Sequence, residues 1–160
     1  VVSVCFSPDG RLLASATEKT VRLWDVASRQ LIGSIEGYTF RIRSVTFSPD
    51  GQLLATGAGE GGSSPGGMKL WDVETGALLR TIPYGGFETQ QVAFSPDGNI
   101  LAAGSRLFDA QTGMLIHTIN GGFHAFAPDG LTLVATRGNT VKILDVQIPA
   151  DKKHLAMISL

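Results

Sequence analysis

The sequence predicts an all-β protein, and two repeated strings carry that prediction. The string FSPDG occurs at residues 6–10, 47–51 and 94–98, and it returns as FAPDG at 126–130. After each copy comes a second string: VRLWDV from Val21, MKLWDV from Met68, SRLFDA from Ser105 and VKILDV from Val141. No stretch of helical period is long enough to compete with these short apolar runs. The chain therefore reads as short strands joined by turns.

Each FSPDG string is predicted to be the tip of a hairpin. Ser, Pro, Asp and Gly in this order suit a type I turn, because Pro presets its own φ and Gly tolerates a positive one. An apolar strand ends at Phe6 before the first tip, and another spans residues 12–16 after it. The first two strands of each unit therefore pair across the tip.

Two further strands complete each unit. The VRLWDV string alternates between two faces with the strand period of two. A turn follows it, with the sequences ASRQ, ETGA and QTGM in the first three units. A fourth strand then begins at Leu31, Leu78, Met114 or His154. The unit of four antiparallel strands repeats four times, at about 40 residues.

The repeated unit resembles the WD repeat (Trp-Asp, WD40-type), in which the third strand ends in Trp-Asp. Trp24-Asp25 and Trp71-Asp72 match that motif, while Phe108-Asp109 and Leu144-Asp145 keep the Asp. The resemblance implies β-propeller blades over the whole chain, at approximately 1–36, 37–82, 83–120 and 121–160. WD-type propellers commonly have seven blades. We therefore expect a partial propeller completed by further blades of a parent chain, or, as the alternative, two copies that pair into eight blades.

The units depart from the family at one position. A typical blade carries Gly-His before its first strand, and that His joins a buried hydrogen-bond network with the Trp. The second unit has Gly37-Tyr38 there, and the third has Pro83-Tyr84. We expect that the usual network cannot form and that the blades cohere mainly by apolar packing.

For function, the resemblance implies a non-catalytic scaffold whose surface binds partner proteins or peptides. The alternative is a propeller-type enzyme or small-ligand-binding domain, of the hydrolase or periplasmic kind, because FSPDG-like tips also occur in those. An enzyme needs a unique convergent acid, base or nucleophile, and the sequence offers none. We therefore predict no enzyme, no cofactor and no metal site.

Two patterns that suggest catalysis or nucleotide binding fall in one Gly-rich segment. Residues 57–62 satisfy GxGxxG and residues 62–66 satisfy GxSxG. The first motif needs a following helix, and the second needs a backbone N–H after the serine, where Pro65 has none. We interpret the segment as a flexible hairpin loop without ligand chemistry.

The three histidines give weaker signals. His117 is predicted on an outer, solvated strand position, and His154 has no spaced partner for a metal site. His124 aligns with Val4, Val45 and Val92, on the inward side of a first strand. It is expected to line the channel or to hydrogen-bond in the core, or else to mark a local shift of strand register.

Composition bounds the partners and the location. The formal net charge is −1 with both signs scattered, so no basic footprint favours nucleic acid. No apolar run reaches membrane length. The single cysteine, Cys5, excludes an internal disulfide and fits a reducing compartment, which predicts a cytoplasmic protein.

The partner-binding surface is expected on the irregular loops rather than on the near-identical tips. Aromatic residues and Arg dominate interface hot spots. Residues of these types, and one acid, occur in or near the loops before the second and third units and in the fourth unit. The predicted partner-binding residues are Tyr38, Phe40, Arg41, Tyr84, Phe87, Glu88 and Arg137. As the alternative, Phe40 and Phe87 merely seal gaps between blades.

Overall fold

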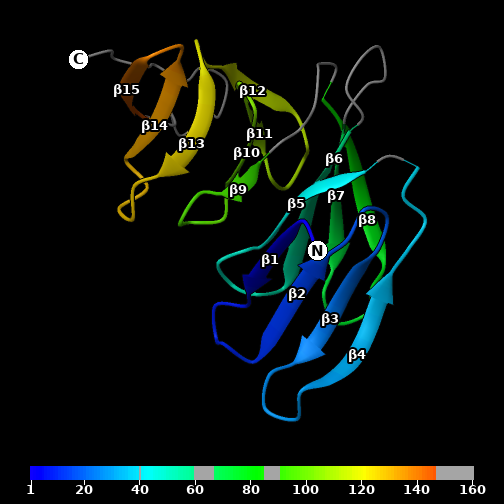
Figure 1. The fold of residues 1–160 in the computed structure, drawn as a ribbon. Coiled ribbons are helices and arrows are strands. Elements are labelled where there is room, and N and C mark those ends of the chain that lie inside the picture. The colour runs from blue at the N-terminus through cyan, green and yellow to red at the C-terminus, as the bar shows by residue number, and fades with distance from the viewer. Residues whose placement is uncertain (40, 60–66, 85–90, 147–160) are drawn as a thin grey trace. The chain divides into compact units, whose positions relative to one another are not determined.

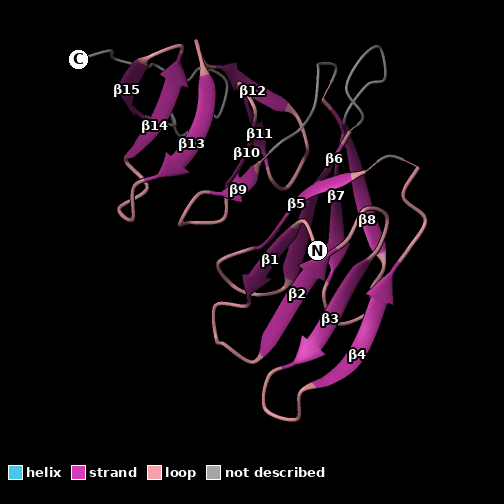
Figure 2. Ribbon diagram, viewed as in Figure 1, coloured by secondary structure: helices cyan, strands magenta, loops and turns pink. Residues whose placement is uncertain are grey.

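A computed structural model of the chain describes residues 1–39, 41–59, 67–84 and 91–146. These residues form fifteen strands and no helix (Figures 1 and 2). All strand pairs for which a register is defined are antiparallel. The prediction of an all-β fold is confirmed.

The strands form four separate sheets, which we call blades 1 to 4, and each follows the chain order. Blade 1 contains β1 (Ser3–Phe6), β2 (Leu12–Ala16), β3 (Val21–Asp25) and β4 (Gln30–Ile35). Blade 2 contains β5 (Ile42–Phe47), β6 (Leu53–Ala58), β7 (Gly67–Asp72) and β8 (Leu78–Pro83). Blade 3 contains β9 (Val92–Phe94), β10 (Ile100–Ala103), β11 (Arg106–Asp109) and β12 (Leu115–Thr118). Blade 4 contains β13 (Gly122–Phe126), β14 (Thr132–Arg137) and β15 (Thr140–Asp145). The fourth strand expected from His154 lies outside the described residues.

The FSPDG tips have a common internal structure. In the first tip the Ser7 hydroxyl donates to Asp9 Oδ1 at 2.6 Å, and its oxygen accepts the N–H of Leu12 at 2.9 Å. Gly10 closes the turn with a φ of +72°. Ser48 with Asp50 and Ser95 with Asp97 repeat the arrangement. Because each of these serines is buried, its hydroxyl fixes the end of the hairpin from inside.

The fourth tip lacks this hydroxyl, and restoring it is expected to stabilise the protein. The backbone around Ala127 matches the other tips: Gly130 N–H donates to Ala127 O at 2.9 Å, and Ala127 N–H donates to Thr132 O at 2.8 Å. In Ala127→Ser the new oxygen can bond Thr132 N–H and Asp129. We expect a gain of about 0.5–1.5 kcal/mol in the free energy of unfolding. At this chain length that is a rise of roughly 2–4 °C in Tm per kcal/mol.

The matched control is Ser48→Ala, which removes the hydroxyl from a tip that has it. Leu53 N–H then loses its partner, and we expect a loss of about 1–3 kcal/mol. If neither change shifts the midpoint of thermal or urea unfolding, the tip hydroxyl does not contribute to the stability of the fold.

Acid is expected to destabilise the chain through the same tips. Hydrogen bonds from the side chains of Ser7 and Ser48 hold the pKa values of Asp9 and Asp50 below their ordinary value. A folded pKa below the unfolded value of about 3.9 gives stabilisation that is present above the unfolded pKa and is lost as the pH falls through the folded one. The Tm should therefore stay level down to about pH 5 and fall below about pH 4. A Tm that rises on acidification would contradict this.

The Asp at the end of each third strand also makes a turn. Asp25 Oδ1 accepts the backbone N–H of Ser28 at 2.7 Å and its hydroxyl at 2.6 Å. Asp72 binds Thr75 in the same way, and Asp109 binds Thr112. This side chain closes the hairpin into the fourth strand, so the repeated Asp has a structural task in three blades.

The chain divides into two compact units, Val1–Val92 and Ala93–Leu160, and each contains its own core. In the first unit, Ala14, Val21 and Leu23 of blade 1 join Leu54 and Trp71 of blade 2 in one apolar cluster. Backbone groups also cross between these blades, since Ile42 N–H donates to Glu18 O at 2.8 Å and Val45 N–H donates to Ser3 Oγ at 3.2 Å. The two blades therefore form one packed body.

The second unit is built in the same way. Leu107 and Ile100 of blade 3 share a cluster with Phe123, Leu133 and Leu144 of blade 4. The register of blade 4 shifts between Phe123 and Ala125, which is a β-bulge at His124. His124 is exposed, and its Nε2 lies 2.7 Å from Thr136 Oγ1. The register shift foreseen for this residue is therefore present.

Candidate functional site

Blade 2 contains a buried hydrogen-bond network, and Tyr38 joins it from the loop before β5. The Tyr38 hydroxyl lies 2.7 Å from Thr56 Oγ1, which also accepts the indole N–H of Trp71 at 3.1 Å. The Tyr38 and Trp71 rings lie 5.6 Å apart at a tilt of 45°. The expectation that no such network forms without the family's His is therefore wrong for blade 2, because the tyrosine hydroxyl reaches the same threonine.

Burial keeps the Tyr38 hydroxyl protonated. It raises the pKa of Tyr38 well above its ordinary value, so the hydroxyl remains a neutral donor at all physiological pH values. The Thr56 hydroxyl donates a hydrogen bond to the carbonyl oxygen of Lys69 at 3.4 Å. Lys69 Nζ stands 4.7 Å from the Tyr38 ring centre and 5.5 Å from the Trp71 ring, where the ring faces attract a cation.

In the other blades, the hydroxyl at the position of Thr56 and the indole at the position of Trp71 are either both present or both absent. In blade 1, Trp24 Nε1 donates to Ser15 Oγ at 2.8 Å. In blade 3 the register places Ala103 at the position of Ser15 and Phe108 at the position of Trp24. In blade 4 the residues at these two positions are Ala135 and Leu144. A buried hydroxyl without a partner costs free energy. Blades without the indole donor accordingly carry an alanine there.

Burial separates the predicted partner-binding residues into two groups. Tyr38 is 5% exposed and Tyr84 is similarly buried. Both belong to the buried core. Phe40, Phe87 and Glu88 lie outside the described residues.

Arg41 remains at the surface, directly before β5, where the backbone is fixed by hydrogen bonds. Its guanidinium is about half exposed and lies 3.1 Å from Glu18 Oε1, on the loop between β2 and β3. The Arg41 carbonyl accepts the N–H of Gly59 at 3.0 Å, and the next residue, Ile42, donates to Glu18 O. Arg41 and Glu18 thus form an exposed charged pair across the junction of blades 1 and 2.

Arg137 is an exposed cation of the second unit. It stands at the end of β14, and its Nη1 donates to Asn120 Oδ1 at 2.9 Å. Two of the seven predicted residues, Arg41 and Arg137, are therefore exposed in the part of the chain that the structure describes. Sequence reasoning missed Glu18, because a lone acid in a turn gives no signal until its partner is known.

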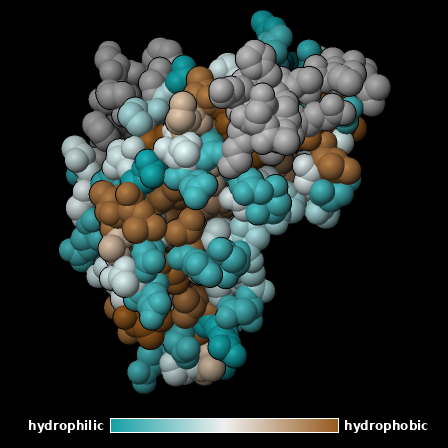
Figure 3. Space-filling model, turned by 180° about the vertical axis from the view of Figure 1, so that it is seen from behind, coloured by the Kyte–Doolittle hydropathy of each residue, from teal (hydrophilic) through white to brown (hydrophobic). Residues whose placement is uncertain are grey.

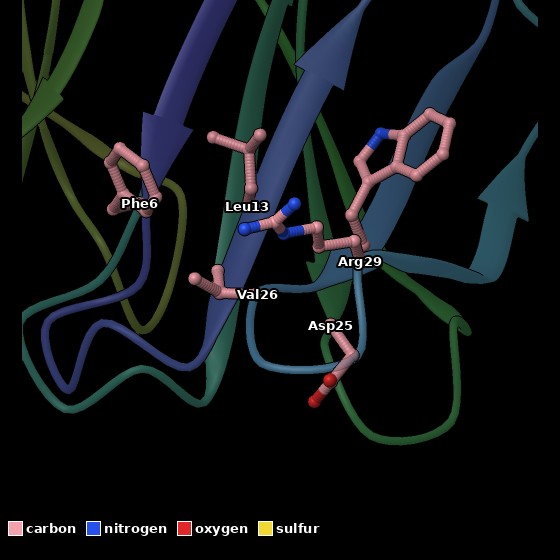
Figure 4. Close-up of a pocket in the computed structure, with 6 residues that line it drawn as sticks. Phe6, Leu13, Asp25, Val26 and Arg29 are labelled. Atoms are coloured by element: carbon pink, nitrogen blue, oxygen red, sulfur yellow. The ribbon is translucent and has the colours of Figure 1, made fainter.

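One acidic side chain lies at a hollow in the surface of blade 1. Asp25 lies at a hollow of about 250 Å³ that is otherwise lined by Phe6, Leu13, Trp24, Val26 and Arg29. Its carboxylate points away from Leu13 and Val26 (Figure 4). Hydrogen bonds from Ser28 lower its pKa, so it stays ionised and is no proton donor near neutral pH. Among the described residues, no group of three His, Cys, Asp or Glu side chains is placed to hold a metal ion.

The Gly-rich segment has hairpin strands on both sides. β6 runs to Ala58, β7 begins at Gly67, and these two residues pair with each other. This is the context predicted for a hairpin connection rather than for a strand-to-helix phosphate site. Residues 60–66 lie outside the described part.

No described helix is both long and apolar enough to span a membrane.

Comparison with known proteins agrees with this geometry. The family model "WD domain, G-beta repeat" matches residues 1–25, 29–72 and 87–109, which is more than half of the chain. The general transcriptional corepressor TUP1 of Saccharomyces cerevisiae is 41% identical over 44 residues. That alignment covers 27% of this chain and 6% of the corepressor, so it compares about one blade.

Proposed function

Because the chain belongs to the WD domain, G-beta repeat family, we propose that it is a non-catalytic scaffold that binds protein or peptide partners. The family and the relative support an interaction scaffold in general terms. The corepressor shares too small a part of its length to indicate a particular partner or process. We therefore identify the site by the chemistry of this chain's own residues.

The observation that supports the proposal best is the charged pair at the junction of blades 1 and 2. Arg41 is exposed, yet the peptide group that joins it to Ile42 is hydrogen-bonded to Glu18 and Gly59, and its guanidinium is paired with the Glu18 carboxylate. A preorganised guanidinium loses little conformational entropy on binding, and it donates two parallel hydrogen bonds to a carboxylate. We propose that Arg41 exchanges Glu18 for an acidic group of the partner, and that Arg137 adds a similar donor in the second unit.

Replacing Arg41 is expected to weaken partner binding without unfolding the chain. The intact protein would first be used to capture partners, and the affinity of a captured partner would then be measured by calorimetry. We expect Arg41→Ala to reduce affinity by about 1–3 kcal/mol, or roughly 5- to 150-fold. The Tm should change little, because an exposed ion pair contributes at most about 1 kcal/mol.

Arg11→Ala is the matched control. Arg11 is an exposed arginine beside an acid, 3.8 Å from Asp9, but it belongs to a tip rather than to the blade junction. The proposal requires that this variant binds like wild type. Loss of affinity in Arg11→Ala, with none in Arg41→Ala, would move the binding site to the tips.

Three further features of the proposal rest on the sequence. A cytoplasmic location fits the single thiol, Cys5, which is free. Burial raises its pKa to about 11, so it is not a reactive thiolate at neutral pH. Nucleic acid and membrane are not proposed as partners, because the near-neutral charge favours neither.

A further inference from the structure

Blade 1 carries an apolar face that is exposed. Hydrophobic side chains reach the surface of the molecule in several groups (Figure 3). On blade 1, Phe6, Leu13, Trp24 and Val26 line the hollow of about 250 Å³ shown in Figure 4. Phe6 is 62% exposed. Phe6 and Trp24 lie on either side of Leu13 on one sheet face, and exposed apolar side chains gathered in this way mark an interaction surface.

The neighbouring repeat shows what such a face binds. In blade 1 the register joins Phe6 to Leu13 and Leu13 to Trp24. Blade 2 has the same residue types in the same register, with Phe47 paired to Leu54 and Leu54 to Trp71. These three are buried, and Phe47 is only 7% exposed. They share one apolar cluster with residues of blade 1. We call this kind of face, in either blade, the aromatic face.

The residues that cover the aromatic face of blade 2 lie on the other side of blade 1. They include Ala14, Val21 and Leu23, and we call this second kind the aliphatic face. In the second unit, blade 3 uses the same face against blade 4, where Leu107 is fully buried at the position of Leu23. Within each unit, therefore, the aliphatic face of one blade packs against the next blade, on the face that corresponds to the aromatic face.

Blade 4 has an exposed aliphatic face. Its register places Val134, Val141 and Ile143 at the positions of Ala14, Val21 and Leu23. Ile143 is 57% exposed, whereas its counterpart Leu107 in blade 3 is 0% exposed. The chain thus has one exposed aromatic face, on blade 1, and one exposed aliphatic face, on blade 4, among the residues that the structure describes.

We propose that the aromatic face of blade 1 binds the aliphatic face of blade 4 in a second copy of this chain. A second copy carries both of the faces that the contact needs, and the contact repeats the one already present between blades 1 and 2. Two copies can make this contact twice, once in each direction. A two-fold axis that relates the two contacts would use both of these exposed faces in each copy and stop growth.

The test is the molar mass of the 160-residue chain by light scattering over a range of concentrations. Wild type is expected at the mass of two chains, falling toward one chain on dilution. Phe6→Asp and Ile143→Asp each place a charge on one face and should give single chains. Both side chains are exposed, so both variants should keep their fold, which circular dichroism checks. Leu79→Asp changes an exposed leucine of β8 that belongs to neither face and should still pair.

Mixing the two variants separates this contact from other ways of pairing. The Phe6→Asp copy keeps its aliphatic face and the Ile143→Asp copy keeps its aromatic face, so an equimolar mixture should recover pairs through one contact. Single chains in the wild type at all concentrations would overturn the proposal. So would a mixture that stays unpaired, pairing lost in Phe6→Asp but kept in Ile143→Asp, or a mass that keeps growing with concentration.

Discussion

Replacing Tyr38 by alanine is expected to lower the free energy of unfolding by about 3–5 kcal/mol, the cost typical of truncating a large buried aromatic side chain. The Tyr38 ring packs against Trp71, and its hydroxyl bonds Thr56 at a buried position. Small domains have a total stability of only about 5–15 kcal/mol. The variant should therefore unfold at a much lower urea concentration than wild type.

Two companion variants separate the parts of this effect. Tyr38→Phe keeps the ring and removes the hydroxyl, while Thr56 retains the Trp71 N–H, so we expect a loss of only about 1 kcal/mol. Thr39→Ala alters the exposed neighbour and should be close to neutral. A Tyr38→Ala variant as stable as wild type, but with weakened partner binding, would return this tyrosine to the binding surface.

The second large effect is expected at Trp71. Trp71→Ala removes a buried indole and leaves the Thr56 hydroxyl with one donor fewer, for a loss of about 3–5 kcal/mol. Trp24→Ala is the matched control, because Trp24 occupies the same position in blade 1 and is only half buried. Its loss should be clearly smaller. Both changes would be measured in the Ile143→Asp background, so that pairing of copies does not cover Trp24.

Equal losses at the two tryptophans would mean that the aromatic face of blade 1 is already covered in the single chain. That result would remove the basis for assigning the face to a second copy. Both indoles donate a hydrogen bond to a hydroxyl. A larger loss of stability at Trp71 would therefore show that burial between the blades, and not the indole hydrogen bond alone, makes this tryptophan stabilising.

The hairpins could be predicted from the sequence because their residues act locally. Ser7, Asp9 and Gly10 determine their turn through contacts within five residues of one another. Local chemistry of this kind is visible in a string of letters, and its repetition strengthens it. The same applies to Asp25, Asp72 and Asp109, which each bond a residue three positions ahead.

The role of Tyr38 could not be read in this way, because its partner Thr56 is eighteen positions away on another strand. Loops generally lie at the surface, so an aromatic residue in one was interpreted as exposed. A signal did exist in the repeats themselves. Blade 2 keeps both Thr56 and Trp71, whereas blades 3 and 4 carry neither a hydroxyl nor an indole there.

The most direct test of the interaction scaffold is hydrogen exchange of the intact chain with and without its captured partner. We predict that the partner slows exchange around the blade junction, at the amides of residues 17–20 and at Arg41 and Ile42, where the Arg41–Glu18 pair lies. The tips at residues 7–10 and 48–51 should exchange at the same rate in both samples. Protection confined to the tips, with none at the junction, would contradict the account.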